Sequence, residues 1–456
     1  MRGAPSGRSM RYNEVSTKLC TEEGIDMAVN AKTAGAAADR PKELSLADFY
    51  NLPDPDLFAK TRAFADFVET QKKAGHYAVR RLLLTSCRNR VVILDQFTGK
   101  PREMIMMASN NYLGLTTHPK VVAAGLAAYS KWGAGAGSVP LLAGTLELHR
   151  ELEQKLAAFK GSEDAIIFPA GYSSNVGIIA GLAREGDIIF NDMLNHASIV
   201  DGSRLSGAEV KTFPHKNLEG LDRALARLSS KYNGKLVIVD GVFSMDGDIA
   251  PVPQMLEICR RHGARLMIDE AHATGVIGEH GHGTPEHHHI EGQVDIVAGT
   301  LSKALGGVGG FAAASRDVVE YLRFYSRSYM FSTALPPAVT ASLIAGLEVI
   351  DSEPQLLASL WGNIRYFRKG LVDLGFDIGL SETAIFPIII GDDWKVKEMT
   401  RLLHQEAVFV NAVFYPAVAR RLSRIRLSLM ATHTREDLDQ TLAACARAGK
   451  KLGVIQ

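Results

Sequence analysis

The sequence predicts an α/β fold, in which a mostly parallel, seven-stranded sheet is covered by helices and is followed by a small C-terminal α/β domain. Seven short apolar runs alternate with amphipathic stretches between residues 112 and 314. The runs are apolar at nearly every position, which is typical of strands buried on both faces of a parallel sheet. The predicted strands are 165–168, 187–190, 210–213, 236–239, 265–268, 296–298 and 311–314.

The composition is that of an ordinary globular protein. The chain has 456 residues, of which 46% are hydrophobic and 22% charged. A net charge of +1 gives no electrostatic reason to expect nucleic acid or an anionic membrane as a partner. No apolar run approaches the roughly 18 residues that a transmembrane segment needs. The four cysteines are scattered, with no paired spacing, which favours a reducing, cytoplasmic location.

The N-terminal part of the chain differs from this alternating centre. Residues 1–45 are rich in small and polar side chains without helical periodicity, which predicts a disordered leader and no secretory signal. Residues 46–110 are predicted to form an N-terminal arm. A helical pattern runs from about Leu44 to Arg90, and strands 91–95 and 104–108 form a hairpin.

The large domain is predicted to span 111–350 and the small domain 351–456. The stretch 336–374 has only helical patterns, so we expect two successive helices there. The small domain then alternates again between strands and helices. Its predicted strands are 386–390, 408–411 and 425–430, and its predicted helices are 393–406 and 435–452.

Asp269 and Lys303 follow two of the predicted buried strands, and His272 lies three residues beyond the aspartate. Open α/β sheets bind ligands at the carboxyl ends of their strands. A lysine, an acid and a histidine at such an edge suit pyridoxal 5'-phosphate. The lysine would form the Schiff base, the acid would keep the pyridine nitrogen protonated, and the histidine would lie over or beside the ring.

A phosphate site is predicted at Gly171, which follows a strand and opens a helix. Glycine permits close approach of the backbone, and the free N–H groups of a helix start attract phosphate. Thr300 could reach the same phosphate with its hydroxyl, and Tyr172 could contact it or simply pack. A capped helix without a ligand is the alternative for this motif on its own.

Two further groups are expected at the same edge of the sheet. His196 follows the 187–190 strand and could stack on the cofactor, whereas Ser244 follows the 236–239 strand and could bond to the phenolic oxygen of the ring. Each residue alone is more often structural. Several strand ends that each carry a group of the right type make a cofactor site the better interpretation.

Two segments carry a family resemblance, Ser109–Leu115 (SNNYLGL) and Gly144–Glu153 (GTLELHRELE). With them, the chain resembles the α-oxoamine synthases, which are fold-type I enzymes dependent on pyridoxal phosphate, from about Asn110 to His433. The resemblance implies a homodimer with active sites at the subunit interface. It also implies residue roles: Asn110 near the substrate, Gly171 and Tyr172 on the phosphate, His196 on the ring, Asp269 on the pyridine nitrogen, His272 on the ring oxygen, Lys303 as the Schiff-base lysine, Ser332 and Thr333 on the phosphate of the partner subunit, and Arg426 on the amino-acid carboxylate.

The implied reaction is a decarboxylative condensation of an L-amino acid with an acyl thioester, delivered by coenzyme A or an acyl carrier protein, to a 3-oxo-amino product, free thiol and CO2. Lys303 would take the α-proton. The segments 325–332 and 423–434 are nearest the serine palmitoyltransferase branch, which favours serine and a role in sphingolipid biosynthesis. Residues 386–411 instead resemble glycine C-acetyltransferase. An 8-amino-7-oxononanoate synthase, a fold-type I aminotransferase and a non-catalytic partner subunit also stay open.

Acyl-chain length is the second open question. Many relatives have Ser-Arg where this chain has Ser138-Val139, and the oxononanoate synthases have threonine at Ala417. The apolar segments 139–143 and 321–331 could line an acyl tunnel, so a medium or long chain is expected.

No metal site is predicted. His280, His282 and the run 287–289 are clustered, but no cysteine joins them, and glycines flank the first two. Such spacing is typical of a solvated loop rather than of a zinc site.

Overall fold

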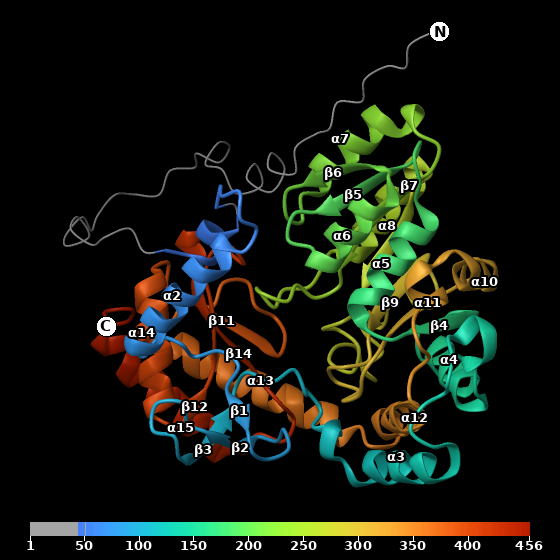
Figure 1. Cartoon of the computed structure of the whole chain (residues 1–456). Helices are drawn as coiled ribbons and strands as arrows, with labels where there is room; N and C mark the ends of the chain where they lie inside the picture. Colours follow the sequence, from blue (N-terminus) through green and yellow to red (C-terminus); the bar gives the residue numbers. More distant parts are fainter. Residues whose placement is uncertain (1–43, 51) are drawn as a thin grey trace.

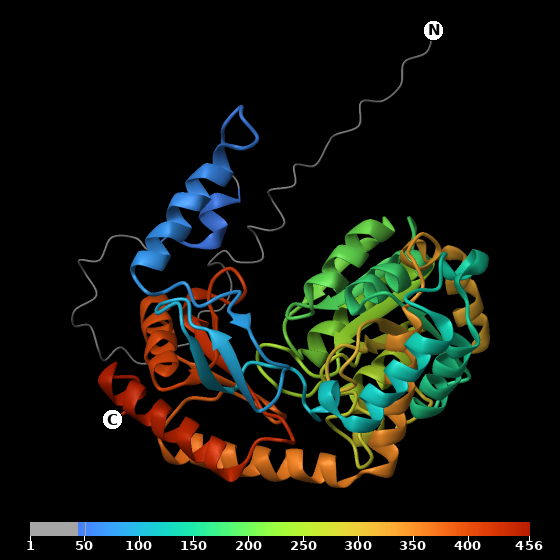
Figure 2. The same cartoon turned by 60° about the horizontal axis from the view of Figure 1, so that its bottom comes forward.

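The computed structural model describes residues 44–50 and 52–456, so the predicted leader lies almost entirely outside the described residues. Two lobes are visible in Figures 1 and 2, one built on the β4–β10 sheet and one containing the C-terminal elements. The two successive helices predicted for 336–374 are present as α12 (Pro337–Ser352) and α13 (Gln355–Asp373), and they lead from the first lobe to the second.

The large lobe contains the predicted seven-stranded sheet. Its strand order is β4-β10-β9-β8-β7-β5-β6, and neighbouring strands from β9 to β6 run parallel. Strand β10 is antiparallel to both β4 and β9, so the sheet is mixed but mostly parallel. The strands are β4 (Asp164–Phe168), β5 (Ile188–Asp192), β6 (Glu209–Phe213), β7 (Lys235–Asp240), β8 (Arg265–Asp269), β9 (Ile296–Thr300) and β10 (Gly310–Ala314).

Alternate residues of these strands pack into two separate cores, one on each face of the sheet. In β4, for example, Ile167 belongs to the larger core and Ile166 to the smaller one. Both faces of the central strands are therefore buried, which explains why their runs are largely apolar, whereas the edge strand β6 is mostly exposed and carries polar residues. Helices α4 (Glu147–Phe159), α7 (Leu218–Leu228) and α8 (Val252–His262) contribute to the larger core, and α5 (Gly171–Leu182), α6 (Ala197–Ser206), α10 (Arg316–Tyr325) and α11 (Arg327–Met330) to the smaller one.

The small lobe has an antiparallel sheet in the order β11-β14-β13. The prediction of one strand at 408–411 was wrong. The segment is divided, because β12 pairs in parallel with β3 of the N-terminal hairpin whereas β13 pairs with β14. The elements are β11 (Ile385–Ile389), α14 (Asp393–Gln405), β12 (Val408–Phe409), β13 (Asn411–Val413), β14 (Arg424–Ser428) and α15 (Arg435–Lys451).

The N-terminal hairpin is confirmed as β2 (Arg90–Leu94) and β3 (Pro101–Met106). The prediction of helix from Leu44 to Arg90 was only partly correct. A short 3-10 helix, η1 (Leu46–Phe49), precedes α2 (Ala59–Lys73), and β1 (Leu82–Leu83) pairs with β2. Helix α2 ends because Gly75 takes a left-handed φ of 72°, which terminates an α-helix.

Among the described residues, no helix is both long and apolar enough to cross a lipid bilayer. Helix α3 (Pro119–Trp132) packs along α12 beneath the large sheet in Figure 1. Proline at the first position of α3 and of α12 suits a helix start, because the missing N–H would have no partner there.

Candidate active site

Two acidic side chains lie next to each other at the carboxyl edge of the large sheet. Asp240 ends β7, Asp269 ends β8, and the two residues are paired in the register of these parallel strands. Both are buried. Lys303 follows β9 on the next strand, and both carboxyls influence the pKa of its amine, Asp269 more than Asp240. The structure thus brings together the acid and the lysine that the sequence predicted.

The surroundings of Lys303 lower the pKa of its amine. Loss of hydration lowers the pKa of Lys303 from its ordinary 10.5 to about 8, Asp269 opposes that shift, and the Arg426 cation adds to it. The free amine, which is the nucleophilic form, is therefore populated near neutral pH.

A pH-dependent capture reaction follows from that pKa. We expect apo-protein to capture pyridoxal phosphate covalently on Lys303 with a rate that rises with pH and has a midpoint near 8. The rate rises with pH because only the unprotonated amine attacks an aldehyde. Borohydride trapping at a series of pH values, followed by peptide mass analysis, measures the midpoint. A midpoint close to 10.5 would contradict the lowered pKa.

Asp269 is held by two donors. Its Oδ2 accepts from Nδ2 of Asn175 at 2.6 Å and its Oδ1 from the amide of Ala271 at 2.9 Å. Such bonds stabilise a carboxylate. Asp240 accepts a longer bond, 3.3 Å, from the His196 amide. Burial and the charge of Asp269 raise the pKa of Asp240 well above its ordinary value.

His196 is connected to Asp269 through a short side-chain network. The Asn175 amide that bonds to Asp269 also donates to Oγ of Ser198 at 2.9 Å. The Ser198 hydroxyl lies 2.7 Å from Nδ1 of His196. His196 is the N-cap residue of α6, and its ring remains exposed at the edge of the sheet. A flat ligand at this edge can therefore lie against an imidazole whose orientation is fixed.

His272 is buried and lies against Tyr112. The Tyr112 hydroxyl is 2.7 Å from Nδ1 of His272. Burial, together with the cations of Lys303 and Arg426, lowers the pKa of His272 well below its ordinary value. Burial also raises the pKa of Tyr112 to about 12. Both rings are thus neutral at physiological pH, and the tyrosine fixes the orientation of the imidazole.

Gly171 is the first residue of α5 and faces Thr300. A Cβ at position 171 would lie 2.8 Å from both Cβ and Oγ1 of Thr300, so no larger side chain fits without a shift. The close approach exposes the amides at the start of α5, beside the threonine hydroxyl. Tyr172 is 50% exposed and donates its hydroxyl to Asp201. This cradle, with Asp269 and Lys303, fits pyridoxal phosphate.

Strand β14 carries two buried arginines on one face. Nε of Arg426 donates to the Ser244 carbonyl at 2.6 Å, and its two terminal nitrogens lie 3.3 Å from Oδ1 of Asn110. Arg424 instead pairs with Asp246 at 2.6 Å. The structure therefore brings Asn110, Ser244 and Arg426 together, although Ser244 takes part through its carbonyl.

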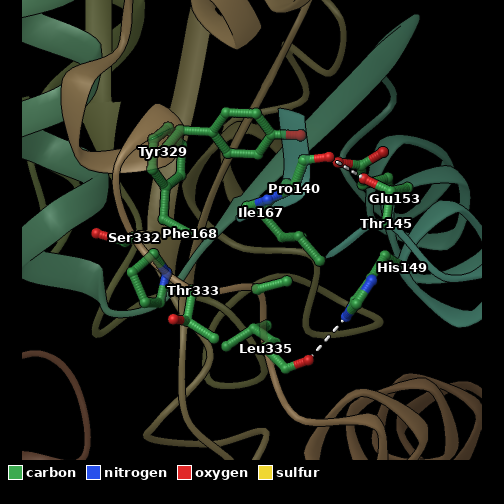
Figure 3. A pocket seen from close by; sticks show the side chains of 12 residues that line it. Pro140, Thr145, His149, Glu153, Ile167, Phe168, Tyr329, Ser332, Thr333 and Leu335 are labelled. Atoms are coloured by element: carbon green, nitrogen blue, oxygen red, sulfur yellow. Dashed lines mark hydrogen bonds between the residues drawn. The ribbon is translucent and has the colours of Figure 1, made fainter. Parts of the chain in front are cut away.

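Ser332 and Thr333 lie apart from this cluster. They follow α11 and, with residues of α4 and β4, line a small cavity of about 10 Å³ (Figure 3). That volume is close to the minimum for one water molecule, so it cannot hold a substrate. In Figure 3 both hydroxyls point away from His149, on the opposite side of the cavity.

Sequence reasoning did not select Asn175, Ser198, Asp240 or Tyr112 as site residues. Asn175 is four residues from Gly171 in the same helix, and Asp240 ends a predicted strand, so spacing could have suggested both. Tyr112 and Ser198 become recognisable only through contacts with residues distant in sequence.

Two of the clustered histidines, His280 and His282, lie near carboxylates. Nδ1 of His280 lies 2.6 Å from Glu286, and Nε2 of His282 lies 3.7 Å from Asp351. In the part of the chain that the structure describes, no three His, Cys, Asp or Glu side chains are grouped so as to hold a metal ion.

Comparisons with known sequences identify related proteins. The model of the aminotransferase class I and II family matches residues 102–444. The 8-amino-7-oxononanoate synthase of Thermoanaerobacter pseudethanolicus is 44% identical over 388 residues, which are 85% of this chain and 97% of the relative. The 4-hydroxy-2,2'-bipyrrole-5-methanol synthase PigH of a Serratia strain is also 44% identical, over 410 residues, which are 90% of this chain but only 63% of that relative.

Solved structures give the same picture. A serine palmitoyltransferase from S. paucimobilis with a bound PLP–myriocin aldimine has a TM-score of 0.83 and 34% identity, and the match covers 88% of this chain and all of that one. The 8-amino-7-oxononanoate synthase of Francisella tularensis has a TM-score of 0.65 and 26% identity over 76% of this chain and 98% of that one.

Proposed function

Because the chain belongs to the α-oxoamine synthase family of pyridoxal-phosphate-dependent C-acyltransferases, we propose that it condenses a small L-amino acid, serine first, with a medium- or long-chain acyl thioester. The products are a 3-oxo-amino compound, free thiol and CO2. The observation that carries the proposal is the grouping of the Lys303 amine, the Asp269 carboxylate and the Arg426 guanidinium at one edge of the sheet.

In this proposal the chain's own residues hold the cofactor and the amino acid. Gly171 and Thr300 bind the phosphate with their amides and hydroxyl, Asp269 bonds to the pyridine nitrogen, and His196 stacks on the ring. When bound there, pyridoxal phosphate supplies an electron sink for negative charge at the α-carbon. Tyr172, Ser244 and His272 are proposed as further contacts to its phosphate and ring oxygen.

Arg426 and Asn110 are proposed to bind the amino acid. A planar guanidinium binds a carboxylate through two parallel bonds. The Ser244 carbonyl and the Asn110 amide oxygen orient that guanidinium from two sides. With the carboxylate fixed, the α-carbon is held near Lys303. The free amine of Lys303 then accepts the α-proton, for which a pKa of about 8 is well matched.

Two similarities support serine as the amino-acid substrate. The match to serine palmitoyltransferase has a TM-score of 0.83. PigH is named for a product with a methanol group, and serine is the amino acid whose side chain is hydroxymethyl. The second candidate is an 8-amino-7-oxononanoate synthase activity, which the 44% identity to that enzyme favours. A cytoplasmic location remains a prediction, and sphingolipid biosynthesis depends on the serine assignment.

The acyl group is proposed to lie along residues 139–143 and 321–331. Leu142 is 80% exposed and Phe331 71% exposed, and the helices that carry or adjoin them, η3 (Pro140–Gly144) and α11, contact each other. In the proposed homodimer, the partner subunit would cover these side chains. Ser332 and Thr333 on the adjoining loop would then reach the phosphate in the partner's site.

Chain length is expected to control binding of the acyl thioester. Each buried CH2 contributes ~0.8 kcal/mol, so a four-carbon extension should improve binding by about 3 kcal/mol, or roughly 10²-fold, in an apolar tunnel. Acetyl, octanoyl and palmitoyl thioesters are compared with serine, alanine and glycine by thiol release and product mass. Equal KM values for all three chain lengths would contradict the tunnel.

The same assay separates the competing reactions. Release of thiol and CO2 without a 2-oxo acid product supports condensation, whereas a 2-oxo acid formed from the amino acid would identify an aminotransferase. Best turnover of acetyl thioester with glycine would replace the proposal by a glycine C-acetyltransferase. No turnover in any combination would favour a non-catalytic partner subunit, which the presence of Lys303 and Asp269 argues against.

A further inference from the structure

His149 is a buried histidine outside the cofactor cluster whose two ring nitrogens are both used. It lies in the first turn of α4 and is only 4% exposed. Nδ1 accepts from the Leu146 amide at 2.9 Å, so this nitrogen carries no proton. Nε2 therefore carries the hydrogen and donates it to the Leu335 carbonyl at 2.8 Å (Figure 3). The ring thus connects the start of α4 to the loop after α11.

The Leu335 bond fixes the end of the loop that carries Ser332 and Thr333. The Ala334 amide donates to the Ser138 carbonyl at 3.1 Å, which ties the same loop to residues that precede η3. Ala334 and Leu335 are buried, whereas Thr333 is exposed. The loop is therefore anchored at its C-terminal end and free to present its hydroxyls.

Surrounding groups leave little room for this anchor to move. The cavity beside His149 has a volume of about 10 Å³. Thr145 closes the adjoining turn by donating to the Pro140 carbonyl at 2.8 Å. Pro336 and Pro337 follow the anchored residues directly and have fixed φ angles, so a displacement at Leu335 would not be absorbed there.

Burial lowers the pKa of His149 and keeps its ring neutral. A neutral imidazole can accept at one nitrogen and donate at the other, whereas an imidazolium can only donate. Both bonds of His149 need the neutral ring. Neither His149 nitrogen is left to bind a substrate, so its role is to position backbone.

We propose that His149 is a positioning residue for the Ser332–Thr333 loop and that, through this loop, it sets the affinity of the dimer for the phosphate of its cofactor. This inference rests on the proposed function, in which the two hydroxyls reach the phosphate bound by the partner subunit. His149 is 186 residues from Leu335 in sequence, and both of its ring nitrogens are bonded to backbone groups.

The test compares pyridoxal phosphate with pyridoxal, which lacks the phosphate. We expect His149→Phe, which removes both bonds, to weaken pyridoxal phosphate binding about tenfold, the typical size for one or two lost hydrogen bonds. Pyridoxal binding should change less than about twofold, because its ring contacts do not involve this loop. Dissociation constants for the full-length dimer come from quenching of intrinsic fluorescence. Equal weakening of the binding of both ligands would overturn the inference. A general loosening of the fold would weaken both to the same extent, whereas loss of a phosphate contact weakens only pyridoxal phosphate.

Two amide variants separate the two bonds. His149→Gln places an N–H near the position of Nε2 and should recover most of the phosphate selectivity. His149→Asn is too short to reach Leu335 and should behave like His149→Phe. The same behaviour of both amides would overturn the role of the Leu335 bond. Circular dichroism and sedimentation confirm that each variant is folded and dimeric, and His149→Gln keeps the test informative if His149→Phe does not fold.

Thr333→Ala tests separately the premise that the hydroxyls of this loop reach the cofactor phosphate. It should reduce the selectivity for pyridoxal phosphate over pyridoxal, and adding His149→Phe should reduce it no further, since residues that act as a unit are not additive. Full additivity would overturn the inference. If both Thr333→Ala and Ser332→Ala leave the selectivity unchanged, the phosphate role of the loop is wrong and the inference falls with it, whereas the condensation assay remains a separate test of the reaction.

Discussion

Replacement of Lys303 by alanine is expected to lower kcat by about 10²–10⁴-fold, the usual contribution of a positioned proton-transfer group. The amine lies at the edge of the sheet beside Asp269 and Arg426, and its lowered pKa, about 8, makes it competent as both nucleophile and base. The variant should also lose covalent attachment of the cofactor. Steady-state kinetics and borohydride trapping, followed by peptide mass analysis, measure the two effects independently.

Two controls sharpen this result. Lys303→Arg keeps a positive charge but offers no free amine near pH 8, so it should fail as severely as alanine. Lys211→Ala removes a lysine from the edge strand β6, where it pairs with Glu209 on the surface, and should have no effect. A borohydride adduct on a lysine other than Lys303 in the native protein would show that the site is misplaced.

Replacement of Asp269 by asparagine is expected to cost about 3–5 kcal/mol of transition-state stabilisation, or roughly 10²–10⁴-fold in kcat/KM, because it removes one partner of a buried charge interaction. The side chain keeps its shape, and Asn175 can still bond to it. Asp269 raises the pKa of Lys303, so its loss should move that pKa further below 8. The midpoint of cofactor capture by the apo-protein should therefore shift to lower pH while turnover falls.

Asp240→Asn is the matched control for this experiment. Asp240 is the register partner of Asp269 on the neighbouring strand, and its raised pKa makes its native form similar to the neutral amide. The carboxamide oxygen introduced at this position can still accept from the His196 amide. We expect a loss of kcat/KM well below that of Asp269→Asn. Equal losses in the two variants would show that the negative charge is shared between the Asp240 and Asp269 carboxyls rather than held by Asp269.

Much of the fold could be predicted because local pattern and tertiary environment agree. A strand buried on both faces is apolar at nearly every position, so the strands of the large sheet other than the exposed edge strand β6 are visible in sequence. The helix start at Gly171 is equally local, because a strand, a glycine and a stretch of small and apolar residues occur in order. These signals also placed Asp269 and Lys303 at strand ends.

The errors occurred where local pattern is ambiguous. An amphipathic stretch from Leu44 to Arg90 does not reveal that Gly75 ends the helix, because φ is a property of the folded backbone. The segment 408–411 begins with three apolar residues, yet Val408 and Phe409 pair with the distant hairpin strand β3 whereas Asn411 pairs with the nearby strand β14. Pairing between strands so far apart in sequence depends on the whole fold.

The sequence by itself determined that strands of a mostly parallel sheet end in an acid, a histidine and a lysine suited to pyridoxal phosphate. Only the tertiary structure decided which side chains set the properties of these groups: Asn175 on Asp269, Tyr112 on His272, and Arg426 near Lys303. The physical reason is that residue type follows from local burial, whereas hydrogen bonds and pKa values depend on atoms brought within a few ångströms from distant parts of the chain.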